Sequence, residues 1–93
     1  MKSKKNNRKN IDDLIVEIMR LALLVNRETK HTVFVEFHGH VNSVGVQIHF
    51  NGWNADKDSD YLQCFYLDDT LSPDRFEKCG QIIAKLEELL EEK

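Results

Sequence analysis

Apolar side chains recur along the chain at two different spacings, and the changes of spacing predict its elements. From residue 10 to 25 they recur every three or four positions, which indicates an amphipathic helix. Asn10 is expected to cap this helix, and the polar segment 26–30 to end it. The same spacing over residues 72–93 predicts a second helix, with Ser72 as its cap.

The apolar stripe of the first helix is wider than one face of a small sheet would cover. A surface helix usually buries one stripe and keeps polar residues on its opposite side. Four residues extend the stripe around this helix: Met19, Leu21, Leu23 and Leu24. We therefore expect the helix to be buried on more than one side.

Between the two helices the spacing changes to two, the period of a half-buried strand. Segments 31–38 and 43–50 alternate, whereas segment 61–67 is apolar on both faces, so its orientation stays open. Short connections favour an antiparallel meander, and one sheet face can cover both apolar helix faces. The predicted fold is α+β, a three-stranded antiparallel meander sheet with the N- and C-terminal helices packed on one face (α-β-β-β-α).

The charge of the chain is divided unevenly along its length. The 93 residues are predicted to form one domain, residues 10–93, behind a disordered basic leader, residues 1–9. Five of the thirteen basic residues lie in that leader, so residues 11–93 carry eight basic and sixteen acidic side chains, a formal charge of −8. Such a surface repels phosphate, so nucleic acid is not an expected partner except through the leader.

Hydropathy and the N-terminal pattern predict a cytoplasmic protein. The longest apolar run, residues 21–25, is too short to cross a bilayer, and no signal-peptide pattern stands near the N-terminus. No membrane partner is expected. Cys64 and Cys79 lack the Cys-x-x-Cys spacing of zinc and redox sites, and both are predicted to be small buried side chains.

Three histidines lie within residues 37–50, and the strand register decides whether they can form a metal site. With a four-residue turn, His38 and His49 lie at opposite ends of the hairpin. With a two-residue turn, Glu36 sits opposite His49 and His38 lies diagonal to His49, so that the three are close enough to consider a zinc site. The apolar alternation is the same in both registers, so a metal-binding domain remains one alternative.

The sheet face opposite the helices is the predicted contact surface. The turn at residues 51–52 presents Trp53, which either contacts a partner or folds back over the sheet edge. Residues 56–60 imitate a calcium loop without its turn glycine and bidentate glutamate, which indicates an acidic solvated loop. The third strand adds one of two sets to this face: Tyr61, Gln63 and Phe65, or Leu62, Cys64 and Tyr66. The predicted partner-binding residues are Phe34, His38, Gln47, His49, Trp53, Asp56, Asp58 and Asp60.

The residue types on this face predict binding and not catalysis. No nucleophile or cofactor motif accompanies them, so we expect a non-enzymatic protein without a cofactor. An apolar and aromatic face ringed by acid is typical of a protein interface. The leading hypothesis is an interaction module whose partner is either a second copy, forming a homodimer, or a basic protein. The alternative is a nucleic-acid mimic that blocks a basic site through Asp56, Asp58, Asp60, Asp68 and Asp69.

Three segments also carry a resemblance in layout: MKSKKNNRKN, HVNSVGVQIHFNGWN and LSPDRFEKCGQIIAKLEELLEEK. Together they resemble small uncharacterised proteins encoded by phages and prophages of low-GC Gram-positive bacteria. Size, acidity and layout are also similar to some phage-borne inhibitors of CRISPR nucleases, which occupy basic nucleic-acid sites. The resemblance implies a phage or mobile-element accessory protein that acts by stoichiometric binding, and it assigns a role to no individual residue.

Overall fold

A computed structural model describes residues 10–92, and the predicted basic leader, residues 1–9, lies outside the described residues. The chain forms two helices and three strands in the predicted order. Their bounds are α1 Ile11–Glu28, β1 Thr32–His38, β2 Ser43–His49, β3 Tyr61–Tyr66 and α2 Arg75–Glu91. None of the helices in the described part of the chain has the length and apolar character needed to cross a bilayer.

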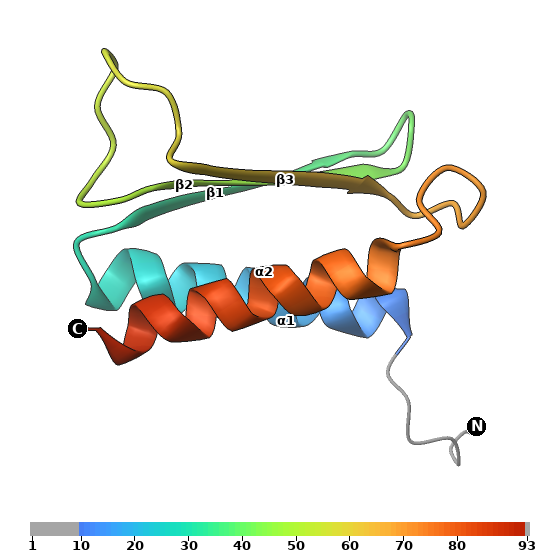
Figure 1. Cartoon of the computed structure of the whole chain (residues 1–93), viewed down its shortest axis with the longest axis horizontal. Coiled ribbons are helices and arrows are strands. Elements are labelled where there is room, and N and C mark those ends of the chain that lie inside the picture. Colours follow the sequence, from blue (N-terminus) through green and yellow to red (C-terminus); the bar gives the residue numbers. More distant parts are fainter. Residues whose placement is uncertain (1–9, 93) are drawn as a thin grey trace.

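The elements form two layers, a sheet and a pair of helices (Figure 1). The sheet is an antiparallel meander in the order β1-β2-β3. Both helices lie on the same side of it and run in the same direction, with α1 packed on β1 and α2 on β3 (Figure 1). The predicted α-β-β-β-α fold is therefore confirmed, and neither α1 nor α2, the helices of the described residues, lies on the other side of the sheet.

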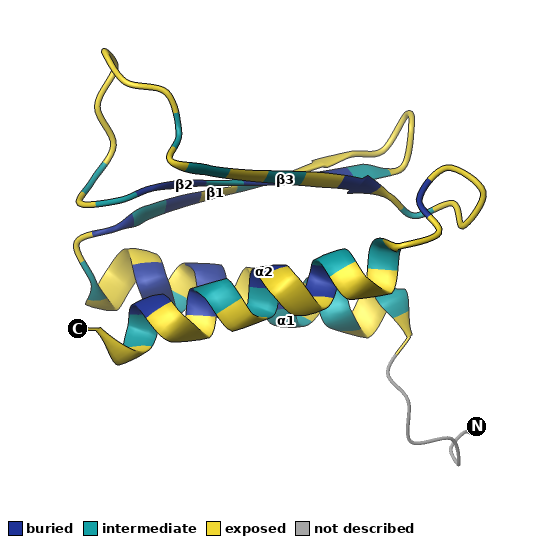
Figure 2. Cartoon of the chain, viewed as in Figure 1, coloured by how far each residue is buried: buried dark blue, intermediate teal, exposed yellow. Residues whose placement is uncertain are grey.

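The core fills the space between the two layers, where the buried segments of both helices and of the sheet meet (Figure 2). Its largest fully buried side chains are Phe65, Ile18, Ile48, Ile82, Leu86, Val25, Val44, Val46 and Cys79. Burying each large aliphatic or aromatic side chain stabilises the fold by about 1.5–3 kcal/mol. Because this core draws on both helices and on all three strands, neither helix can detach without exposing it.

The two helices begin differently from each other. In α1 the predicted cap is confirmed, since the Asn10 side-chain oxygen accepts a hydrogen bond from the Asp13 N–H at 2.9 Å. The prediction that Ser72 caps the second helix is wrong, because α2 begins at Arg75. The buried Ser72 hydroxyl instead accepts a hydrogen bond from the Tyr66 N–H at 2.9 Å and so ties the connection to the end of β3.

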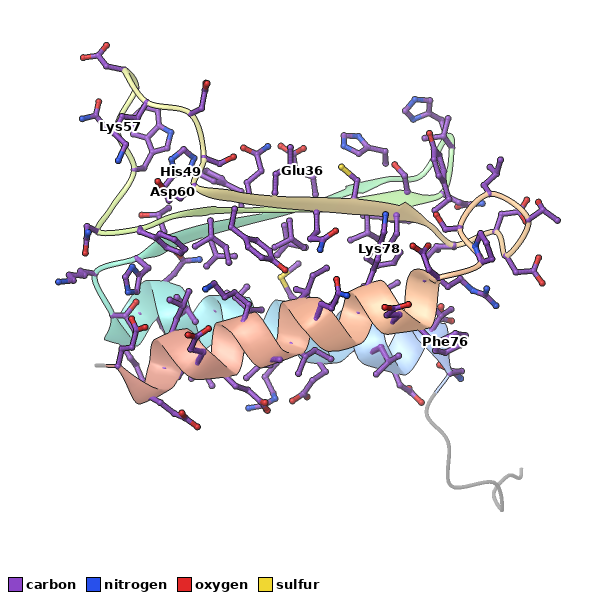
Figure 3. The ribbon with its side chains drawn as sticks, in the orientation of Figure 1. Glu36, His49, Lys57, Asp60, Phe76 and Lys78 are labelled. Carbon is purple, nitrogen blue, oxygen red and sulfur yellow. The ribbon has the colours of Figure 1, made fainter. Side chains whose placement is uncertain are left out.

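Side chains form hydrogen bonds with backbone groups at both edges of the sheet. At the β1 edge, Asn26 of α1 accepts a hydrogen bond from the Val33 N–H at 2.8 Å and donates one to the Val33 carbonyl at 2.9 Å. At the β3 edge, Ser72 takes one N–H, and Lys78 of α2 donates to the Cys64 carbonyl at 3.0 Å (Figure 3). Unpaired strand edges promote association with other strands, and these contacts limit that risk.

One flank of α1 has no cover from the residues that the structure describes. As predicted, α1 packs against two neighbours, β1 and α2, and Leu21 is buried. Met19 and Leu23, however, are 43% and 50% exposed, and Val16 beside them is 68% exposed. The burial predicted for this flank is therefore not found within residues 10–92.

The two cysteines differ in exposure. Cys79 is fully buried as predicted, and burial raises the pKa of its thiol to about 11. The prediction that Cys64 is buried is wrong, because β3 turns this residue to the open face.

We expect a thiol reagent at pH 8 to label Cys64 of the native protein and to spare Cys79, because only an accessible thiolate reacts. Intact-mass spectrometry should show one label per native chain and two in denaturant, and Cys64→Ser should remove the native label. Rapid double labelling of the folded protein would contradict the burial of Cys79.

Candidate functional site

The β1–β2 hairpin has the four-residue turn of the two registers considered above. Thr32 pairs with His49, and His38 pairs with Ser43, so the two histidines stand at opposite ends of the hairpin. Glu36 pairs with Gly45 and not with His49. A metal site formed by Glu36, His38 and His49 would require the register with a two-residue turn. The observed register is the other one and keeps these three side chains from meeting.

A smaller polar group remains at the turn end of the hairpin. His38 Nε2 lies 3.4 Å from Glu36 Oε1, and the rings of His38 and His40 are 6.4 Å apart in an edge-to-face arrangement. These side chains are exposed. Over residues 10–92, no three or more histidine, cysteine or acidic side chains are grouped so that they could hold a metal ion.

The open sheet face, defined here by its outward residues, carries apolar and aromatic side chains on its two edge strands and polar ones on its central strand. The pairing of β3 with β2 resolves the orientation of the third strand, since the inward Val44 lies opposite Phe65. The open face therefore consists of Thr32, Phe34, Glu36, His38, Gln47, His49, Leu62, Cys64 and Tyr66. Figure 3 shows Glu36 and His49 on this side of the sheet, pointing away from the helices.

The loop of residues 51–60 rises above one end of the open face (Figure 1). Backbone contacts fix both of its ends. The Trp53 N–H donates to Thr32 Oγ1 at 3.1 Å, and the Phe50 N–H donates to Asp60 Oδ2 at 2.7 Å. Gly52, with φ +111°, makes the turn that an L side chain would resist. The loop is thus held by the sheet while its side chains stay available.

His49 lies beneath this loop and not in solvent. Only 6% of its surface is exposed, and its ring meets Phe34 edge to face with centroids 5.7 Å apart. The long loop covers this end of the face and shields the His49 imidazole from solvent. Figure 3 shows Lys57 and Asp60 at the same end as His49.

The loop and the sheet border an open hollow of about 590 Å³. Its lining residues are Gln47, His49, Trp53, Lys57, Asp58, Ser59, Asp60 and Leu62. Trp53 is 57% exposed, so of its two predicted placements the structure has the outward one. Five of the eight predicted partner-binding residues thus meet at one site, and Phe34 adjoins it through His49. His38 lies at the far end of the hairpin, and Asp56 is not part of the lining.

The chain matches no protein-family model, no curated protein and no solved structure. The resemblance to phage and prophage proteins therefore stays a prediction.

Some residues of the candidate site were not predicted from the sequence. Lys57, Ser59 and Leu62 complete the hollow, and Leu62 belonged to one of the two sets considered for the third strand. His31 is buried beside the loop, where its Nδ1 accepts a hydrogen bond from the Asn51 N–H at 3.0 Å. One feature of the sequence could have predicted the burial of His31. It lies two residues before Val33, so it follows the alternation of the inward-facing residues of β1.

The hollow suits a cation. Asp60 is partly occupied, because one of its oxygens accepts the Phe50 N–H and the other lies 3.9 Å from Lys57 Nζ. Within residues 10–92, Asp58 has neither a hydrogen bond nor an ion pair through its side chain. A guanidinium or ammonium group could contact this carboxylate and stack on the Trp53 indole, a combination that binds cations well.

Proposed function

We propose that the chain is a non-enzymatic binding protein that acts stoichiometrically on a basic protein partner. Its open sheet face supplies the apolar contact area, and the hollow beneath the loop receives a lysine or arginine side chain of the partner. The observation that carries this proposal is the meeting of Trp53, Asp58 and Asp60 around one hollow at the end of an uncovered sheet face. No cofactor is required for this function.

Charge favours a basic partner over a second copy at this face. This face and its loop carry four carboxylates and one ammonium group. The carboxylates belong to Glu36, Asp56, Asp58 and Asp60, and the ammonium group belongs to Lys57. Two copies joined face to face would bring these carboxylates together, and like charges at an interface cost free energy. The proposal includes a cytoplasmic site of action and an origin in a phage or mobile element, and both rest on the sequence patterns described above.

The nucleic-acid mimic finds less support from the placement of its aspartates. Asp56, Asp58 and Asp60 lie before β3, whereas Asp68 and Asp69 follow it, so the strand separates the groups by roughly 20 Å. The Thr70 hydroxyl and N–H both donate to Asp68, which lowers the pKa of this carboxyl and engages it in its own turn. The acids therefore form two separate groups, whereas a duplex presents a continuous row of phosphates.

The proposal is tested with a basic peptide as the probe, because Trp53 is the sole tryptophan of the chain and reports directly on its own surroundings. Titration with octa-arginine should change the Trp53 fluorescence, and the affinity should fall as salt is added. Amide chemical shifts should change in the loop and along β2 and β3. Trp53→Phe, followed by these amide shifts, should weaken binding at least about threefold because the indole is lost.

Phe76→Ala is the matched control, since Phe76 is also an exposed aromatic residue but belongs to α2 and contacts Arg75. It should bind the peptide as the unaltered chain does. Octa-glutamate should change neither the Trp53 fluorescence nor the amide shifts of the loop, β2 and β3. Two results would exclude the open face as the binding surface. The first is amide shift changes confined to the helices, and the second is an affinity that changes neither with salt concentration nor with Trp53→Phe.

A further inference from the structure

The uncovered flank of α1 forms a regular seam. The seam comprises residues 12, 16, 19, 23 and 26, which are separated alternately by four and three positions, the spacing at which two helices pack along one line. Its centre is apolar, with Val16, Met19 and Leu23 all at least 43% exposed. Its ends are polar, with Asp12 at one end and Asn26 at the other.

The seam faces sideways, away from α2 and past the edge of the sheet. Arg20 of α1 lies within electrostatic range of α2, since Glu87, after Glu17, contributes to raising the pKa of Arg20. On the other flank, Asn26 reaches the outer backbone groups of Val33 in the edge strand β1. A helix approaching along the seam would therefore meet α1 without obstruction from α2.

We propose that the seam is the interface of a homodimer in which two copies of α1 pack antiparallel about a two-fold axis. The axis passes between Met19 and Arg20, which places Val16 of each copy against Leu23 of the other. The same axis brings Asp12 of each copy next to Arg27 of the other, because both pairs of positions have the same midpoint in the sequence. In this single register the apolar centre is buried against its copy, and the charged groups at both ends form ion pairs.

The charges argue for a second copy over an unrelated partner. Asp12 and Arg27 are exposed and have no ion-pair partner among residues 10–92. They are separated by about 22 Å along the helix, too far to pair within one chain. A self-complementary arrangement of this kind is what a two-fold interface requires. The dimer leaves the open sheet face free, so this proposal does not depend on the proposed function.

Sedimentation equilibrium of the full chain tests the dimer. The unaltered chain should approach twice its 10.9 kDa mass as its concentration rises. Met19→Glu should raise the dissociation constant at least about tenfold, because it places two carboxylates at the axis. Leu71→Glu is the matched control, since Leu71 is exposed but distant from the seam, and it should leave the dimer intact.

A charge exchange tests the register. Arg27→Glu should weaken the dimer at least about threefold through repulsion from Asp12 of the other copy, and adding Asp12→Lys to the same chain should restore it. Asp13→Lys controls for the effect of a first-turn charge on the helix dipole, because Asp13 lies off the seam, and it should not weaken association. A chain that stays monomeric at every concentration, a dimer indifferent to Met19→Glu, or a double variant without recovery would overturn the proposal.

Discussion

Phe65→Ala is expected to destabilise the folded chain by about 3–5 kcal/mol, because removing a fully buried aromatic ring leaves a cavity that the rigid sheet cannot close. Phe65 is 1% exposed and points from β3 into the layer between sheet and helices. Domains of this size have a total stability of about 5–15 kcal/mol, so the loss is a large share of it. Thermal unfolding followed by circular dichroism should show a melting temperature lower by roughly 12 °C or more.

Phe34→Ala is the matched comparison, since it removes the same ring from the opposite face of the sheet. Phe34 is 39% exposed and contacts His49 but not the core. We expect its cost to be about 1 kcal/mol, the value of an edge-to-face aromatic pair. Equal losses for the two variants would mean that the open face is covered in solution, and the two-layer description would then be wrong.

Asn26→Ala should have the second-largest effect, because it removes both hydrogen bonds that hold the Val33 backbone at the β1 edge. Two bonds of this kind are worth roughly 1–3 kcal/mol, and the better helix propensity of alanine offsets up to about 0.7 kcal/mol of that loss. Hydrogen exchange followed by NMR should show faster exchange of the Val33 amide in particular.

Arg27→Ala serves as the control for this prediction when both variants are compared at concentrations where the chain is monomeric. Arg27 is the neighbouring exposed residue on α1, and its removal should leave the exchange of Val33 unchanged. If Asn26→Ala left the Val33 amide equally protected, the side chain of Asn26 would not be the group that occupies this edge.

Local patterns predicted the elements of this chain well, because helix and strand spacing are properties of neighbouring residues. The strand predicted at 43–50 is observed at Ser43–His49, and the cap at Asn10 is confirmed. Ser72 shows where such patterns fail. A serine hydroxyl can accept from its own helix or from another segment, and only the folded chain reveals that the Tyr66 N–H needed a partner.

The candidate site depended on information that alternation does not contain. Both hairpin registers gave the same sequence of inward and outward residues, so the separation of His38 from His49 could not be derived. A third strand apolar on both faces likewise concealed the exposure of Cys64. The hollow around Trp53 arises from a long loop that folds back over distant residues of β2, and no short-range pattern encodes such a return.

The division of the sheet into a packed face and an uncovered face has an evolutionary consequence. Substitutions on the uncovered face remove few core contacts, so selection for stability restrains them weakly. Relatives of this chain could therefore exchange the residues around the hollow and acquire new binding targets while keeping the same scaffold. Sequence divergence should then be concentrated on outward positions such as Phe34, Gln47 and Leu62, and rare at inward positions such as Val46 and Phe65.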